Sequence, residues 1–354
     1  MAEQKFRKIG VLTSGGDAPG MNAALRAVTR SALSRGVEVV AVAKGYTGLI
    51  SGELIDLTPE KVSGISAISG TILYSDRCLE FATEEGMAKA VKTCRDNNID
   101  GMICIGGDGT FRGATDLTDH GVPCIGIPAT IDNDITSTDY TLGFDTAMNT
   151  AMNMADNLRD TCESHARASI IEVMGRDAGY IAVEAGIACG AVAVAIPEVP
   201  FDADACINRM LEQRKAGIRS FIIMVSEGLG GEFGEALTKR INDVGIDARF
   251  ARLAHVVRGG KPTLRDRFTA ARMGDAAVDA LLAGKSNLVI CEKEGKIVAR
   301  DIKYALVLDR MYKNKLRDGD LEQFSPEVLA EMKAECAAHV EEMKELYVLA
   351  NDLA

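Results

Sequence analysis

Short apolar runs alternate along most of the chain with longer stretches in which apolar residues recur every three or four positions. The runs are bounded by glycine, serine and charged residues, a pattern typical of strands buried in a parallel sheet. Such strands are predicted at 8–13, 37–42, 101–105, 122–127, 168–174, 191–197 and 220–226. Helices are predicted at 21–34, 84–97, 146–161, 203–216 and 230–244. This alternation predicts an α/β fold, since parallel strands need crossover connections that are usually helical.

Residues typical of turns and of helix ends predict further elements in the rest of the chain. A helix is expected up to Gly284, and 287–291 with 296–300 predict a hairpin. Ser325 is a typical N-cap and Pro326 suits a first helical position, so a long helix is expected from there to about residue 349. Residues 45–75 are rich in glycine and serine and predict turns with short strands.

Composition limits the function classes. The chain has 354 residues, 47% of them hydrophobic, enough for two domains with sizeable cores. A formal net charge of −11 argues against nucleic acid or an anionic membrane as the main partner, because both require a basic face. Nine cysteines without a CxxC spacing favour free thiols in a reducing cytosol. The polar N-terminus and the lack of an apolar run of about 18 residues lead us to expect a soluble, cytoplasmic protein.

Glycines and carboxylates gather where predicted strands end. The strand at 101–105 runs into Gly106-Gly107-Asp108-Gly109-Thr110, and a helical pattern follows at once. Backbone N–H groups and the helix dipole favour a phosphate at such a helix N-terminus. The strand at 122–127 runs into Pro128-Ala129-Thr130-Ile131-Asp132-Asn133-Asp134. A phosphate cradle beside paired carboxylates is typical of a phosphoryl-transfer site.

Each of these signals also has an ordinary structural explanation. Asp132 and Asp134 could form turns, Asp108 could cap a helix, and His255 could be a core histidine. Arginines such as Arg176 could form surface ion pairs of little energetic consequence. Such explanations do not account for the placement of charged groups at loop after loop on the presumed ligand edge of the sheets.

Several long motifs in one order resemble the ATP-dependent 6-phosphofructokinases of bacterial type. The resemblance covers positions 8 to about 310 and rests on residues 9–22, 105–110, 128–134, 172–176 and 255–260. It implies an α/β protein of two domains, each a mostly parallel sheet flanked by helices, with the active site between them. The larger, ATP-binding domain would comprise 1–143 and 257–307. The smaller, sugar-phosphate domain would comprise 144–256 and 308–354.

The resemblance also implies a nucleotide site and a sugar site. The residues that would hold ATP are Gly16, Arg77, Cys78, Gly107, Asp108, Gly109 and Thr110. Asp108 would bind Mg²⁺, which prefers hard oxygen ligands. The residues that would bind fructose 6-phosphate are Thr130, Asp132, Arg167, Met174, Gly175, Arg176, Glu227, Arg249, His255 and Arg258.

Within these sites the resemblance implies particular roles. Asp132 would be the general base, with Thr130 beside it, while Arg77 and Arg176 would stabilise charge on the transferring phosphoryl group. Arg167 and Arg249 would reach the sugar phosphate from a neighbouring subunit, so a homodimer or homotetramer is expected. One departure from the family pattern is Cys78, which replaces an aromatic residue.

Alternatives remain open at this stage. The segment 175–180 also resembles pyrophosphate-using relatives, although Gly109 and Ala129 stand where those carry an aspartate and a lysine. A nucleotide-binding oxidoreductase is suggested by the glycine-rich loop at 14–20, but that loop lacks the G-x-G-x-x-G spacing. A non-catalytic sugar-phosphate sensor is disfavoured because Asp108 and Asp132 are both kept.

Overall fold

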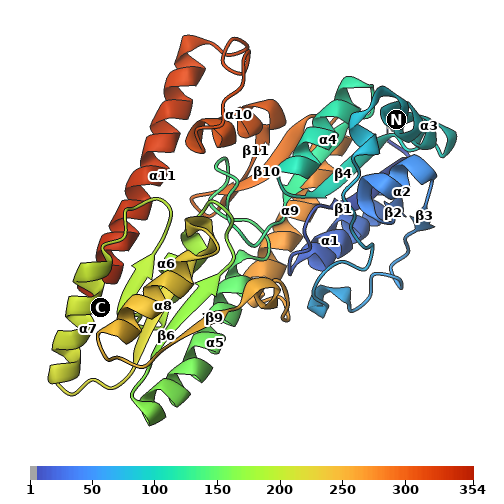
Figure 1. Cartoon of the computed structure of the whole chain (residues 1–354). Helices are drawn as coiled ribbons and strands as arrows, with labels where there is room; N and C mark the ends of the chain where they lie inside the picture. The colour runs from blue at the N-terminus through green and yellow to red at the C-terminus, as the bar shows by residue number, and fades with distance from the viewer. Residues whose placement is uncertain (1–5) are drawn as a thin grey trace. The chain divides into compact units, whose positions relative to one another are not determined.

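The computed structural model describes residues 6–354 and divides them into two compact units (Figure 1). The first unit contains the chain up to Ile131, together with Ile135–Asp145 and Gly260–Phe324. The second contains Asp132–Asp134, Thr146–Gly259 and Ser325–Ala354. The chain thus passes from one unit to the other several times.

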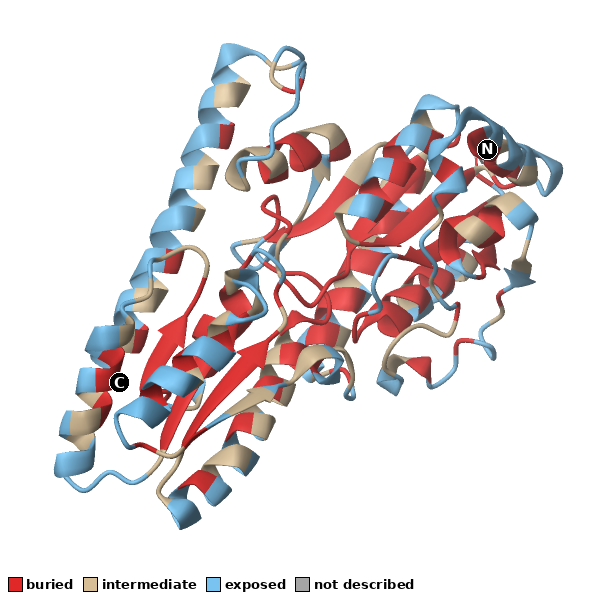
Figure 2. Ribbon diagram, viewed as in Figure 1, coloured by how far each residue is buried: buried red, intermediate tan, exposed pale blue. Residues whose placement is uncertain are grey.

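A seven-stranded sheet with the order β11-β10-β5-β4-β1-β2-β3 forms the centre of the first unit. The strands are β1 (Lys8–Ser14), β2 (Glu38–Val42), β3 (Leu54–Asp56), β4 (Gly101–Gly106), β5 (Cys124–Pro128), β10 (Leu288–Lys293) and β11 (Lys296–Asp301). The five from β10 to β2 run parallel, while β3 and β11 pair antiparallel at the two edges. Every residue of β4 is buried, as expected of a central strand covered on both faces (Figure 2).

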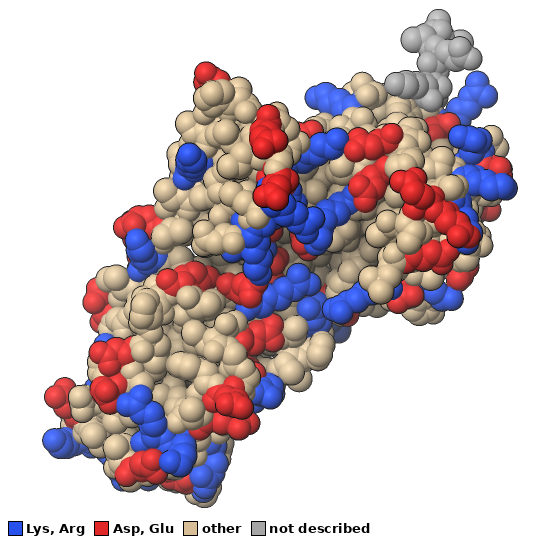
Figure 3. All heavy atoms as spheres, turned by 45° about the horizontal axis from the view of Figure 1, so that its top comes forward, with Lys and Arg blue, Asp and Glu red and all other residues tan. Residues whose placement is uncertain are grey.

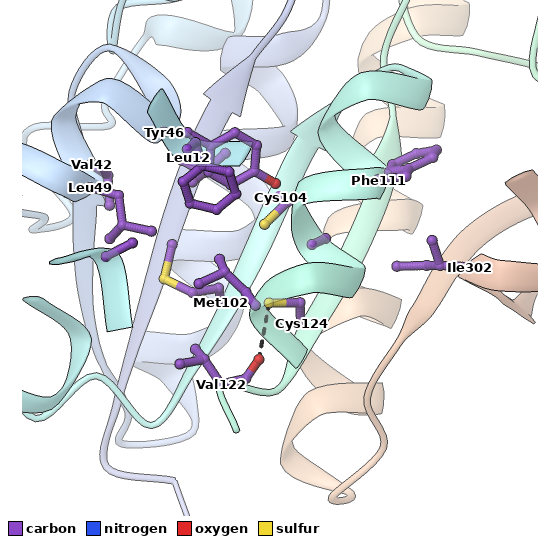
Figure 4. Packing of buried hydrophobic residues seen from close by; sticks show 14 of the residues in the cluster. Leu12, Val42, Tyr46, Leu49, Met102, Cys104, Phe111, Val122, Cys124 and Ile302 are labelled. Carbon is purple, nitrogen blue, oxygen red and sulfur yellow. Dashed lines mark hydrogen bonds between the residues drawn. The ribbon is translucent and has the colours of Figure 1, made fainter. Parts of the chain in front are cut away.

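Helices cover this sheet and close its core. They are α1 (Met21–Ser34), α2 (Gly45–Ser51), α3 (Glu84–Asp96), α4 (Asp108–Asp119), α9 (Leu264–Leu282) and α10 (Ile302–Tyr312). Phe111 of α4, Met102 of β4 and Leu12 of β1 are all fully buried in one cluster (Figure 4). Gly126 of β5 is required there, because a Cβ at that position would meet the Phe111 ring at 2.6 Å.

The second unit has a four-stranded, fully parallel sheet with the order β7-β8-β6-β9. Its strands are β6 (Ala168–Val173), β7 (Ala193–Ala195), β8 (Phe221–Ser226) and β9 (Ala248–Arg252). Its helices are α5 (Phe144–His165, whose first two residues belong to the first unit), α6 (Tyr180–Ala188), α7 (Ala203–Lys215), α8 (Phe233–Asp243) and α11 (Pro326–Asp352). The long α11 packs against α6 and β7, and Arg209 of α7 donates a hydrogen bond to Asn351 at 3.3 Å.

The α/β class and most predicted elements are confirmed, including the hairpin β10–β11 and the Ser325 cap, which accepts from the Val328 N–H at 3.4 Å. Two helices were missed. The prediction of turns at 45–75 overlooked α2, where Gly48 lets the Ala43 carbonyl approach closer than any side chain would allow. No prediction was made for α10, although Asp301 caps it by accepting from the Tyr304 N–H at 2.9 Å.

Residues 308–324 were assigned to the smaller domain from the sequence, but they lie with the first unit. Asp309 anchors this segment by accepting a hydrogen bond from the Thr136 hydroxyl at 3.1 Å. Arg310 and Asp320 then close the following loop with a bidentate ion pair. These contacts join residues far apart in the chain, which local patterns do not report.

Three observations bear on the expectations from composition. Acidic and basic side chains are interspersed over the face shown in Figure 3. No helix within residues 6–354 is long and apolar enough to cross a membrane. In the same range all nine cysteines are free thiols.

Candidate active site

Three neighbouring strands of the first unit end side by side. The register pairs Ser14 of β1 with Gly106 of β4, and Gly106 with Pro128 of β5. The crossover after β1 leads to β2 on one side, whereas the crossover after β4 leads to β5 on the other. In open α/β sheets, ligands bind at such a divergence, beyond the carboxyl ends of the strands. We call these strand ends, with the loops that follow them, the phosphate edge.

The glycine-rich loop of the phosphate edge is held by buried hydrogen bonds. The Thr110 hydroxyl donates to the Ser14 carbonyl at 3.0 Å, and the Tyr46 hydroxyl donates to the Thr110 carbonyl at 2.6 Å. A Cβ at Gly106 would meet both the Ser14 carbonyl and the Thr110 hydroxyl at 2.3 Å, so glycine is required for this approach. The loop after β4 is therefore fixed against the loop after β1.

The N-terminus of α4 faces open space. A helix N-terminus is found at this loop, as the sequence predicted, but the helix begins at Asp108 and its cap residue is Gly107. A Cβ at Gly107 or Gly109 would meet no protein atom within 4 Å, and neither glycine has a positive φ. Protein packing therefore does not require these glycines. The room they leave, in front of the N–H groups of a helix N-terminus, fits a phosphate.

Asp108 supplies a carboxylate at this helix end. Its side chain is 36% exposed and forms an ion pair with Arg112 at 2.7 Å. Burial acts to raise the pKa of Asp108, but Arg112, the Gly109 N–H and the charge of Lys313 outweigh it, so the pKa lies below its usual value. Asp108 is thus ionised at neutral pH, as a metal ligand must be.

The predicted nucleotide residues Arg77 and Cys78 lie on a loop tied to the phosphate edge. The Ser75 hydroxyl donates to the Gly15 carbonyl, and the Thr13 hydroxyl donates to the Tyr74 carbonyl at 3.1 Å. Arg77 is exposed, whereas Cys78 is half-buried and packs against the core of the first unit. The ring of Tyr46 stacks on Phe81 with centroids 4.0 Å apart, which supports the end of this loop.

An arginine and two aspartates form a second group, which we call the acid–arginine cluster. Asp132 is fully buried, and its Oδ2 lies 3.1 Å from Nε of Arg176. The guanidinium of Arg176 is also 4.0 Å from a carboxylate oxygen of Asp134. A cation close to a buried carboxylate offsets much of the free-energy cost of removing that carboxylate from water. The structure thereby brings together three residues that the sequence placed in two separate motifs.

The backbone of Arg176 is strained, with a φ of 52° in the left-handed region. Oε1 of Glu227 accepts hydrogen bonds from the N–H groups of Gly175 at 3.2 Å and Arg176 at 3.0 Å. Gly228 is equally required, because a Cβ there would meet the Arg176 carbonyl at 2.4 Å. The conformation that directs Arg176 to Asp132 is held by the loop after β8.

The predicted sugar-site residues of the second unit fall into two groups. Those after the carboxyl ends of the strands are Met174, Gly175, Arg176, Glu227, His255 and Arg258. Arg167 and Arg249 lie instead at the amino ends of β6 and β9, which start in register. Because β6 spans six residues, the two edges are about 20 Å apart.

At the amino edge, Arg167 and Arg249 share one acid. Asp247 pairs with Arg167 at 2.5 Å and with Arg249 at 2.7 Å. The hydrogen bond from Arg167 is the main reason why the pKa of Asp247 is lowered. Two arginines around one carboxylate leave a net positive charge, which suits an anion. Within one chain, however, this cation pair is remote from the acid–arginine cluster.

Thr130 follows β5 in the chain, two residues before Asp132. It is 8% exposed, and its carbonyl accepts from the Thr141 hydroxyl at 2.6 Å. Sequence reasoning missed Arg112 and Asp247, although both stand close in the chain to a predicted residue. It also missed Lys313, for which no local signal existed because α10 reaches Asp108 only through the tertiary fold.

The phosphate edge and the acid–arginine cluster together are typical of an α/β phosphotransferase. Comparison with known proteins narrows this class. Residues 8–281 match the family model described as Phosphofructokinase. The chain therefore belongs to the phosphofructokinase family, and the resemblance found in its motifs is confirmed.

Individual relatives agree. The ATP-dependent 6-phosphofructokinase 1 of Clostridium perfringens is 51% identical over 312 residues, which cover 88% of this chain and 97% of that protein. The ATP-dependent 6-phosphofructokinase of Clostridium acetobutylicum is 48% identical, with 88% and 98% covered.

Solved structures are similar as well. A phosphofructokinase of Saccharomyces cerevisiae has a TM-score of 0.83 at 32% identity and matches 94% of this chain, which spans 50% of the yeast chain. A pyrophosphate-dependent phosphofructokinase of Marinobacter aquaeolei has a TM-score of 0.74 at 25% identity, with 84% of this chain and 83% of that one covered.

The left-handed backbone at position 176 can be tested with two variants. Arg176→Ala and Arg176→Gly both remove the guanidinium, but only glycine adopts a positive φ without steric cost. We expect Arg176→Gly to be more stable than Arg176→Ala by about 1 kcal/mol, measured by urea denaturation. Equal stability, or a more stable alanine variant, would contradict the strained conformation.

Proposed function

We propose that this protein is an ATP-dependent 6-phosphofructokinase, which transfers the γ-phosphoryl group of ATP to the 1-hydroxyl of fructose 6-phosphate. The observation that carries the proposal is the buried Asp132 with Arg176 at 3.1 Å, a base and a cation in one cluster. Relatives at 46–51% identity that bear this name support the donor and the acceptor. Family membership argues against an oxidoreductase.

The phosphate edge would hold the nucleotide. The N–H groups at the start of α4 would bind phosphate oxygens in the space left by Gly107 and Gly109, with Thr110 bracing the loop. Gly16, in the loop after β1, would contribute to the same nucleotide site. Arg77 is exposed on the adjoining loop and would approach the phosphates from there. For Cys78, which packs inward, only a backbone contact or one edge of the thiol would be left for the nucleotide.

Asp108 fits the expected Mg²⁺. It is ionised, half-exposed and at the helix end where phosphates would lie. No cluster of three or more metal-ligating side chains occurs within residues 6–354. This suits Mg²⁺, which is commonly held by one or two carboxylates and by substrate phosphates. When bound, the ion neutralises charge on the phosphates.

The acid–arginine cluster would perform the chemistry. Asp132 accepts the proton of the sugar 1-hydroxyl as that oxygen bonds to the γ-phosphorus, and the bond to the bridging oxygen of ADP breaks. Arg176 stabilises the charge on the transferring group, and Asp134 holds the guanidinium in place. Met174, Gly175, Glu227, His255 and Arg258 would bind the sugar near the same strand ends.

The remaining assignments follow from these roles. The first unit would be the ATP-binding domain and the second the sugar-phosphate domain. Arg167 and Arg249 would bind the 6-phosphate held by a neighbouring copy, because about 20 Å separates them from the cluster of their own chain. A homodimer or homotetramer in the cytoplasm is therefore proposed.

The general base is tested by Asp132→Asn. The amide keeps the size of the side chain but accepts no proton, so kcat should fall by about 10²-fold or more while ATP binding persists. Production of ADP and fructose 1,6-bisphosphate is followed in a coupled assay, with exposed Asp243→Asn as the matched control. A near-normal kcat would remove Asp132 from this role. No fructose 6-phosphate-dependent ADP from the wild-type protein would overturn the function.

The phosphoryl donor is tested at Gly109. Purified enzyme should turn over ATP far faster than pyrophosphate, because Gly109 leaves room for the α-phosphate and Ala129 carries no charge. Gly109→Asp should fold, since its Cβ meets no protein atom and an acid suits the first helical turn. We expect it to lower kcat/KM for ATP by about tenfold or more through clash and repulsion.

The matched control is Gly231→Asp, which adds the same side chain at another open glycine without a positive φ. Faster turnover with pyrophosphate than with ATP would reverse the donor assignment and leave the role of Asp132 standing. An unchanged kcat/KM in Gly109→Asp would place the nucleotide elsewhere.

Subunit sharing is tested by complementation. Arg249→Ala and Asp132→Asn are each expected to be nearly inactive alone. Hybrids refolded from a mixture should recover part of the activity, because some sites then combine an intact cluster with an intact cation pair. Differently tagged chains and two-step purification isolate the hybrids. Inactive hybrids of verified composition would contradict sharing.

A further inference from the structure

The loop that carries Arg176, residues 175–179, is fastened at both ends by glutamates. At its start Glu227 binds the Gly175 and Arg176 N–H groups. At its end Oε1 of Glu198 accepts from the Gly179 N–H at 2.8 Å. Glu198 follows β7 in the chain and was not recognised as a site residue from the sequence.

The fit around Glu198 is tight. A Cβ at Gly179 would lie 2.6 Å from Oε2 of Glu198 and 2.5 Å from the Ile196 side chain, so only glycine permits this approach. The neighbouring peptide is held from another side, because the Ser226 hydroxyl donates to the Ala178 carbonyl at 3.2 Å. The end of the loop is therefore fixed by contacts from the loop after β7 and from the last residue of β8.

The second carboxyl oxygen of Glu198 is buried and has no hydrogen-bond partner among residues 6–354. Burial raises the pKa of Glu198, although the Gly179 N–H opposes this. A buried carboxyl oxygen without a hydrogen-bond partner is costly, and a purely structural contact with Gly179 could be made by an uncharged side chain. A role for Glu198 beyond simple packing would account for this cost, and the segment that its contact with Gly179 fixes is the end of the loop that carries Arg176.

We propose that Glu198 is a positioning residue for Arg176: by fixing Gly179 it holds the 175–179 loop in the conformation that directs the guanidinium to Asp132. The inference rests on the proposed role of Arg176 in phosphoryl transfer. Glu198 acts through the backbone and does not touch the reacting groups. Misplacing a catalytic group by about 1 Å can cost up to 10²-fold in rate, so a loop contact of this kind affects turnover.

The test compares three changes at position 198. Glu198→Ala removes the contact and should lower kcat about tenfold, with KM for ATP changed less than about twofold. Glu198→Gln keeps an oxygen for the Gly179 N–H and should retain kcat within about threefold. Glu198→Asp withdraws the carboxylate by one methylene and should resemble alanine; it replaces alanine if that variant does not fold. Exposed Glu212→Ala is the control.

The same changes in an Arg176→Ala background separate positioning from a structural role. If Glu198 acts through Arg176, Glu198→Ala should lower kcat less than about twofold once the guanidinium is gone. A tenfold loss in both backgrounds, or no loss in the wild-type background, would overturn the proposal.

A readout independent of activity distinguishes this failure from failure of the proposed function. The Nε–H resonance of Arg176, assigned by its loss in Arg176→Ala, should move in Glu198→Ala and stay in place in Glu198→Gln. If the Arg176 resonance shifts in Glu198→Ala but the wild-type protein has no kinase activity, the positioning role is upheld and the proposed function is rejected. An unmoved resonance would reject the positioning whatever the activity.

Discussion

The buried contact between Arg176 and Asp132 is the interaction on which the candidate site depends. A fully buried carboxylate is tolerated because a guanidinium lies 3.1 Å away, and that guanidinium reaches it from a backbone in a left-handed conformation. The conformation is maintained by Glu227, Gly228 and Glu198, which come from the loops after β7 and β8. Residues that follow β6, β7 and β8 therefore all contribute to the geometry of this one ion pair.

The phosphate edge of the first unit depends on glycines of two kinds rather than on an ion pair. Its tightly packed glycine, Gly106, brings two loops together, whereas Gly107 and Gly109 leave space that the protein does not fill. The first kind of glycine serves packing, and we propose that the second serves a ligand. A lone sequence pattern does not separate these two uses. The contacts around each position do, and they support a phosphate in front of α4.

Much of the candidate site could be predicted from the sequence. Asp108, Asp132, Arg176 and Glu227 each lie in a loop after a predicted strand, where parallel strands present residues at one edge, and the family resemblance implied their roles. Arg112 and Asp247 were missed although they stand near named residues. Glu198 also follows a predicted strand, at 191–197, but no motif singled it out. Lys313 could not have been found this way, since it acts on Asp108, which is distant in the chain.

By itself, the sequence determined the α/β class, most element positions and the motifs that mark the phosphofructokinase family, because strand burial, helix periodicity and glycine turns are local properties. The tertiary structure alone decided that Arg176 meets Asp132, that Arg167 and Arg249 lie at the opposite edge of their sheet, and that residues 308–324 join the first unit. These outcomes depend on strand order and on which loops meet. Strand order is set by packing between distant segments, which leaves no periodic trace in the chain.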